Sequence, residues 1–95
     1  MRLCVQVLIA TLWLALPASA HCYADYRAQQ NNPVRFHYGV AEIPASACGN
    51  AQAAASHLAP RLQQQGWILV DVLSTFGPEG LASRRERAGQ FHLRF

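Results

Sequence analysis

The chain changes from helix to strand within "LQQQGWILVDVL", the stretch from Leu62 to Leu73. Upstream, apolar residues recur at spacings of three and four, ending at Leu62, which is the spacing of one helix face. Gly66 stands where a helix commonly ends in a left-handed residue. The β-branched and apolar residues from Trp67 to Phe76 are typical of a strand. This junction therefore predicts a helix that runs directly into a sheet.

The helix is predicted over residues 44–65. Asn50 or Ser46 can cap its start. Pro60 lies inside it and removes one backbone hydrogen bond, so we expect a kink there or a division of the helix. The apolar face of this helix is expected to comprise Cys48, Ala51, Ala55, Leu58 and Leu62.

Two further strands follow from alternating side chains. From Val34 to Val40 the apolar residues stand at even positions, and from Gln90 to Phe95 they stand at odd positions. Residues 77–80 read as a turn and residues 83–89 as a solvated basic loop. The order strand, helix, strand, strand predicts an α+β fold of the βαββ type, with one helix, kinked at Pro60, on a three-stranded sheet.

The first twenty residues have the three parts of a secretory signal peptide. Arg2 gives the positive start, an apolar run follows, and Ala18-Ser19-Ala20 gives the cleavage site. The run is too short for a membrane anchor, and the residue before Cys22 is His21 rather than the small residue that lipidation needs. We therefore expect cleavage after Ala20, an extended arm over residues 21–33, a βαββ domain over residues 34–95, and a periplasmic or secreted protein.

The cleaved chain of 75 residues keeps Cys22 and Cys48. An even cysteine pair in an exported protein favours a disulfide, and a domain this small often needs one. The alternative is a reactive thiol pair, but a C-x-x-C motif is missing. We expect a structural bridge that ties the arm to the start of the helix.

The stretch from Leu62 to Leu73 resembles a family of very short bacterial βαββ domains of unknown function. In these domains a helix ends in Gly-Trp and runs into a hydrophobic strand, as Gly66 and Trp67 do here. The strand from Val34 to Val40 also matches, whereas Pro60 and the cysteines depart from the pattern. A more distant likeness is to the small βαβ modules of periplasmic secretin and pilus assemblies. The resemblance implies the fold and no activity.

A sheet covered by one helix leaves one face open, and that face together with the basic loop predicts a contact surface for a protein partner. The cleaved chain carries seven arginines against five acidic residues, too mild a charge for nucleic-acid binding. The predicted role is a non-enzymatic interaction module, either an envelope-assembly accessory or an inhibitor or immunity-type protein. Its expected surface comprises Arg35, His37, Leu69, Asp71, Leu73, His92 and Arg94 of the sheet and Arg84, Arg85 and Arg87 of the loop.

The alternative role is periplasmic copper binding. After cleavage, the free amine and imidazole of His21 can chelate copper, and His37 and His92 on the polar strand faces can complete the site. The spacing of these histidines forms no ligand motif. We expect no catalytic residues, no cofactor and no stable membrane insertion after cleavage.

Overall fold

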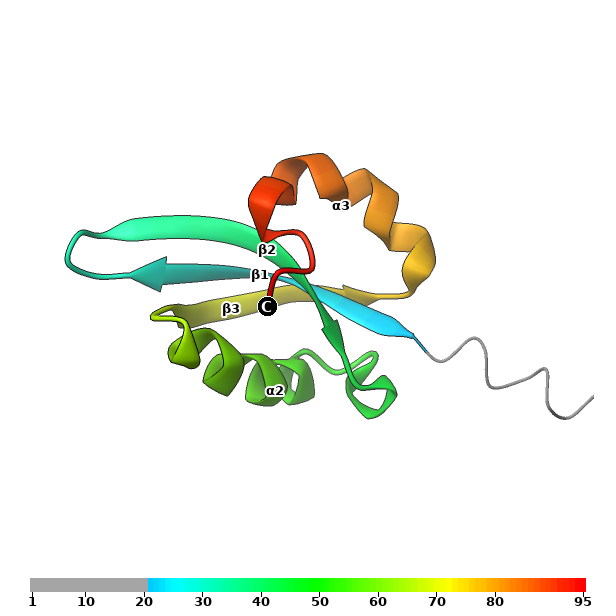
Figure 1. Cartoon of the computed structure of the whole chain (residues 1–95). Helices are drawn as coiled ribbons and strands as arrows, with labels where there is room; N and C mark the ends of the chain where they lie inside the picture. Colours follow the sequence, from blue (N-terminus) through cyan, green and yellow to red (C-terminus); the bar gives the residue numbers. More distant parts are fainter. Residues whose placement is uncertain (1–20) are drawn as a thin grey trace, which may run out of the picture.

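The computed structural model describes residues 21–95, so the predicted signal peptide at residues 1–20 lies outside the described residues. Three strands form one sheet, and two helices lie on its opposite faces (Figure 1). The protein is therefore α+β, as predicted. Within residues 21–95, the helices are shorter or less apolar than a membrane span requires.

The sheet has the order β2-β1-β3. The central strand β1 (Cys22–Gln30) is antiparallel to both neighbours, β2 (Arg35–Ile43) and β3 (Ile68–Phe76). The β1–β2 hairpin extends beyond both helices (Figure 1). One end of the sheet is therefore uncovered on the side that carries α3 (Leu81–Ala88).

Helix α2 (Ala51–Gln64) begins later than predicted, after Asn50, which is one of the two predicted caps, and it ends just before Gly66 as predicted. The side chain of Asn50 accepts a hydrogen bond from the backbone N–H of Ala53, at 3.0 Å. At the other end, Gly66 has φ of 85° and its N–H donates to Gln63, while the N–H of Trp67 donates to Leu62. These two bonds form a Schellman motif. The helix continues through Pro60 without division.

The core between α2 and the sheet uses small residues. Ala24 and Ala28 of β1 are fully buried, as is Ala41 of β2. Leu58 and Leu62 of α2 fill the space opposite them. Small side chains on the sheet let the helix approach closely, so a short chain can still enclose a dense core.

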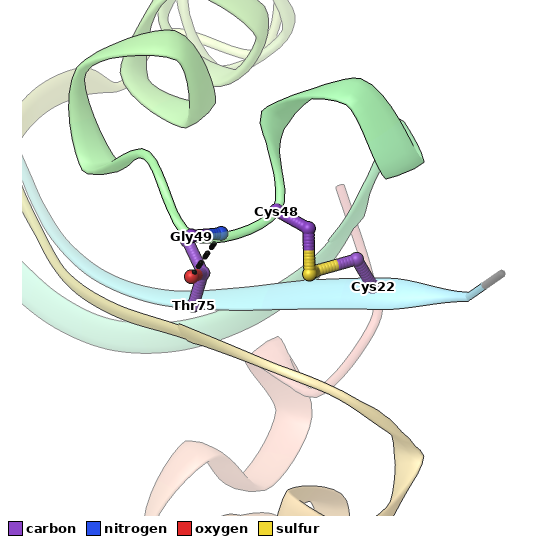
Figure 2. Close-up of a disulfide and its surroundings, with 4 residues drawn as sticks. All are labelled: Cys22, Cys48, Gly49 and Thr75. Atoms are coloured by element: carbon purple, nitrogen blue, oxygen red, sulfur yellow. Dashed lines mark hydrogen bonds between the residues drawn. A yellow bond between two sulfur atoms is a disulfide. The ribbon is translucent and has the colours of Figure 1, made fainter.

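The predicted disulfide is present. Cys22 at the start of β1 is bonded to Cys48, with 5.8 Å between the two Cα atoms. Figure 2 shows that a second contact lies beside it: the N–H of Gly49 donates to the hydroxyl of Thr75 in β3, at 2.8 Å. The segment before α2 is thus tied to the central strand and to β3.

The N-terminal segment corrects the expected topology. Residues 21–33 were expected to form an extended arm outside the sheet, but β1 occupies most of them and forms the centre of the sheet. The short 3-10 helix η2 (Ala45–Ala47) precedes α2. The expected βαββ order becomes two strands, α2, β3 and α3.

The C-terminal segment also differs from the expectation. After the 3-10 turn η3 (Pro78–Gly80), the predicted basic loop forms α3, and residues 90–95 do not pair as a hairpin with β3. They include the end of η4 (Gly89–Phe91) and then pass along the outer edge of β2. There His92 forms a single parallel bridge with Val40, and the N–H of Leu93 donates to the carbonyl of Val40 at 2.7 Å.

Candidate binding surface

Two rows of side chains cross the whole sheet on the face that α3 only partly covers. Directly paired residues of neighbouring strands point to the same face. Gln29 of β1 pairs with Phe36 of β2 and with Ile68 of β3. Arg27 likewise pairs with Tyr38 and with Asp71. We call the surface formed by Arg27, Gln29, Phe36, Tyr38, Ile68, Val70 and Asp71 the hairpin face.

The hairpin face presents large apolar side chains to water. Phe36 is 70% exposed, Ile68 51% and Val70 49%, and neighbouring Val34 is 64% exposed. Phe36, Val70 and Tyr38 line a shallow groove of about 430 Å³ together with Arg27 and residues 28, 29 and 37. Several exposed apolar side chains around one groove are typical of a contact site rather than of scattered surface residues.

An ion pair divides this apolar surface. The guanidinium of Arg27 donates to both carboxylate oxygens of Asp71, from Nε at 2.9 Å and from a terminal nitrogen at 2.6 Å. The hydrogen bonds from Arg27 lower the pKa of Asp71, which therefore stays charged at neutral pH. Because this carboxylate is already neutralised, a partner needs no cation to meet it.

Helix α3 is fixed over the other half of this face by a buried carboxylate. Asp25 accepts hydrogen bonds from the hydroxyls of Ser74, at 2.6 Å, and Tyr38, at 2.9 Å, and from Nε of Arg84, at 3.1 Å. Arg87 in turn donates to the hydroxyl of Tyr38, at 2.8 Å. Burial alone raises the pKa of Asp25, but the bonds from Ser74, Tyr38 and Arg84 outweigh it and lower that pKa.

The arginines of α3 also pack on aromatic rings. The guanidinium carbon of Arg84 lies 3.9 Å from the ring centre of Phe76, and that of Arg87 lies 4.5 Å from the ring centre of Tyr38. Ala88 is the buried residue of this helix. The helix is therefore attached mainly by charged and aromatic contacts, which explains how a short, polar helix stays on the sheet.

The opposite face holds an aromatic cluster around His37. The hydroxyl of Tyr26 and Nε2 of His37 share a hydrogen bond of 3.0 Å. The ring of Phe91 stacks on His37 at 3.8 Å, the ring of Trp67 meets it edge-on at 4.3 Å, and Phe95 lies beyond at 5.8 Å. Burial lowers the pKa of His37 to about 4, so the imidazole is neutral at physiological pH. The cluster anchors the C-terminus.

The expected contact surface is dispersed, and two β-bulges explain much of this. Val70 and Leu73 of β3 have no directly paired residue in β1. The side chains of β3 therefore do not alternate regularly between the two faces of the sheet. As a result Leu69 packs against the core, whereas Asp71 lies on the hairpin face and Leu73 is exposed. On β2 the expected faces are exchanged, because His37 points toward the α2 side and Phe36 away from it.

The remaining predicted surface residues occupy separate places. Arg35 is exposed at the start of β2, His92 lies at its outer edge, and Arg94 lies 5.6 Å from the ring centre of Phe91. Arg85 lines a small groove between α3 and the C-terminal tail. Arg84 and Arg87 instead hold α3 on the sheet.

The three histidines proposed for copper are engaged differently. The imidazole of His21 meets Glu42 at 3.1 Å, that of His37 is buried among aromatic rings, and His92 bridges to β2 through its backbone. Among residues 21–95, histidine, cysteine and acidic side chains form no group of three that could hold a metal ion. Asp25 and Ser74 hydrogen-bond to each other, and Asp25 also accepts from Tyr38 and Arg84. Among residues 21–95, no histidine takes part in this group of hydrogen bonds.

Sequence reasoning missed the hairpin face because it placed Phe36 and Tyr38 toward the helix and left Arg27 in an arm. One signal was available. Cys22, Ala24, Tyr26 and Ala28 alternate with polar residues, which is the pattern of a strand that is buried on one face. Recognising β1 would have placed Arg27 in the sheet.

Comparisons of this chain with protein-family models, with curated proteins and with solved structures found no match.

Proposed function

We propose that this chain is a small exported, non-enzymatic protein-binding module and that the hairpin face is its binding surface. The single observation that carries the proposal is the row formed by Phe36, Gln29 and Ile68 across all three strands, with both apolar ends exposed. In this domain a phenylalanine is 70% exposed beside other apolar residues. Covering this apolar surface with a partner removes it from water, which is favourable.

Phe36 is the expected anchor of this contact. Aromatic residues in the centre of an interface often contribute most of the binding free energy. The Arg27–Asp71 pair beside it gives the surface a polar, directional element that a partner can meet with hydrogen bonds. A partner with an apolar centre and uncharged hydrogen-bonding groups fits this arrangement.

The proposed location is the cell envelope or its exterior. The signal-peptide pattern of residues 1–20 supports export, and a disulfide between Cys22 and Cys48 is compatible with an oxidising compartment. The two candidate roles are an accessory of an envelope assembly and an inhibitor or immunity-type protein that blocks an exported enzyme. The geometry of the histidines adds no support to copper binding.

The test is affinity capture from envelope extracts of the organism that encodes the chain. Wild-type protein should retain one or more specific proteins, and Phe36→Asp should lose them. The matched control is His57→Asp, which introduces the same charge at an exposed residue of α2. Equal capture by wild type and Phe36→Asp, or failure of the wild type to capture anything, contradicts the proposal.

Export has its own test. The intact mass of the exported protein should equal residues 21–95 less two hydrogens for the disulfide. A mass that retains residues 1–20 contradicts the export route, and a mass two hydrogens higher contradicts the bridge.

A further inference from the structure

The two edges of the sheet differ in how they are covered. At the β2 edge the chain's own tail lies alongside, and Leu93 donates to Val40. At the other edge, β3 pairs with β1 on one side, and no other strand of residues 21–95 pairs with it. An edge strand presents unpaired N–H and C=O groups, and these can pair with another extended chain.

A groove runs beside the exposed edge of β3. One wall is a stripe of α2 that includes Ala55, Ser56 and Ala59, and the other is the start of the strand at Trp67, Ile68 and Leu69. We call these residues the edge groove, which has a volume of about 460 Å³. Ala55, Ser56 and Ala59 on the helix wall are small, so an extended backbone can pass close to this part of the helix while it pairs with β3.

The side chains of the edge groove indicate what it accepts. Gln52 and Gln63 complete its lining, so the groove combines neutral amides with apolar surface. Among residues 21–95, no charged side chain lines it. A charged residue that entered it would lose water without gaining an opposite charge, which is costly. Ile68 lines the groove and is half exposed, so an added strand would cover it as well.

We infer that the edge groove binds an extended, uncharged segment of another protein, which adds to β3 as a fourth strand. The backbone of β3 supplies the hydrogen bonds, and the groove selects uncharged, small or β-branched side chains at alternate positions. This site shares only Ile68 with the hairpin face, so it is a second surface and does not depend on the proposed function.

The experiment uses the disulfide-bonded protein and an array of synthetic nine-residue peptides, the length of β3. One half of the array consists of Thr, Val, Ser and Gln, and the other half has Glu or Lys at alternate positions. Uncharged peptides should bind. At saturation they should slow the hydrogen exchange of outward-facing β3 amides by at least about tenfold, while the amides of residues 35–39 in β2 keep their rates.

Matched variants locate the site. Ala59→Arg and Ser56→Arg place a long cation on the helix wall and should weaken peptide binding by at least about tenfold. His57→Arg adds the same side chain on the same helix outside the groove and should leave binding unchanged. Ala59, Ser56 and His57 are all exposed, so the three variants should keep the fold, which circular dichroism checks.

The inference would be overturned if no peptide of the array binds, or if charged and uncharged peptides bind equally. It would also be overturned if neither groove variant weakens binding, or if the amides of β3 become protected without peptide as protein concentration rises. The last result would assign the edge to a second copy of the chain. If Phe36→Asp loses peptide binding and the groove variants keep it, the peptide binds at the hairpin face. That result would overturn this inference and leave the proposed function standing.

Discussion

The ring of Tyr26 lies against Gly39 of the neighbouring strand. A Cβ atom at position 39 would stand 2.6 Å from Cζ of Tyr26, far inside van der Waals contact. The missing side chain lets the buried Tyr26 cross β2 and share its hydrogen bond with His37. This one glycine therefore connects the central strand to the aromatic cluster that anchors the C-terminus.

Gly39→Ala should destabilise the protein by about 1 to 3 kcal/mol, the usual range for an overpacked core. Urea denaturation followed by tryptophan fluorescence measures this change, since Trp67 belongs to the same cluster. Stability equal to that of the wild type would mean that Tyr26 does not pack against Gly39.

The buried His37 predicts a loss of stability in mild acid. Its pKa is about 4 in the folded protein against 6.5 in the unfolded chain, so the unfolded state takes up the proton first as pH falls. Burial is the main cause, and the nearby charge of Arg94 adds to it. The free energy of unfolding should fall by roughly 3 kcal/mol between pH 7 and pH 4.

The pH dependence of chemical denaturation tests this, with His37→Phe as the variant. The phenylalanine keeps the ring stacking but cannot be protonated, so its stability should change much less over that range. His57→Phe alters an exposed histidine and should retain the wild-type slope. A slope that persists in His37→Phe would contradict the assignment. Asp25 adds a further loss as the pH falls through the region of 3.8, where the unfolded chain takes up the proton, because the folded-state pKa of Asp25 is lower than that value.

The Asp25–Arg84 pair predicts how α3 is released. Replacing one partner leaves the other poorly compensated, so Asp25→Asn and Arg84→Gln should each cost about 3 kcal/mol. Hydrogen exchange should show α3 opening before the sheet. The double variant should cost less than the sum of the two single changes, because the pair is directly bonded. Arg85→Gln serves as the control at an exposed arginine of the same helix. Strictly additive effects would show that the contact is not formed.

The disulfide predicts a large effect of reduction. Cys22 and Cys48 are separated by 26 positions, and on the chain-entropy model a loop of that size contributes about 3 kcal/mol. Cys22→Ser with Cys48→Ser should lower the free energy of unfolding by that amount. An oxidised wild type whose stability does not change on adding reductant would contradict a structural role for the bridge.

The sequence alone predicts the α2–β3 junction well, because its signals are local. The cap at Asn50, the left-handed Gly66 and the β-branched run after Trp67 each depend on neighbours in the chain. The disulfide was also predictable from the even number of cysteines after the signal-peptide pattern of residues 1–20. These features do not require knowledge of how distant strands pair.

The central strand and the surface were harder to predict, for physical reasons. In β1 the buried face consists of Cys22, Ala24, Tyr26 and Ala28. It lacks a large aliphatic side chain, which makes its hydrophobic signal weak, although the small alanines are what the close helix requires. The bulges at Val70 and Leu73 move side chains between faces, and they depend on pairing with β1. Helix α3 is fixed by Asp25, which lies 59 positions before Arg84, so its polar sequence alone resembles a loop.

The central claim is that a partner protein covers the hairpin face, and Phe36 is the place to test it. A photoreactive amino acid at position 36 of the protein, irradiated in the cells that produce it, should form an adduct with a distinct partner protein. The same amino acid at position 57, on the exposed side of α2, should form none. Absence of an adduct at position 36, or identical adducts at both positions, would contradict the account.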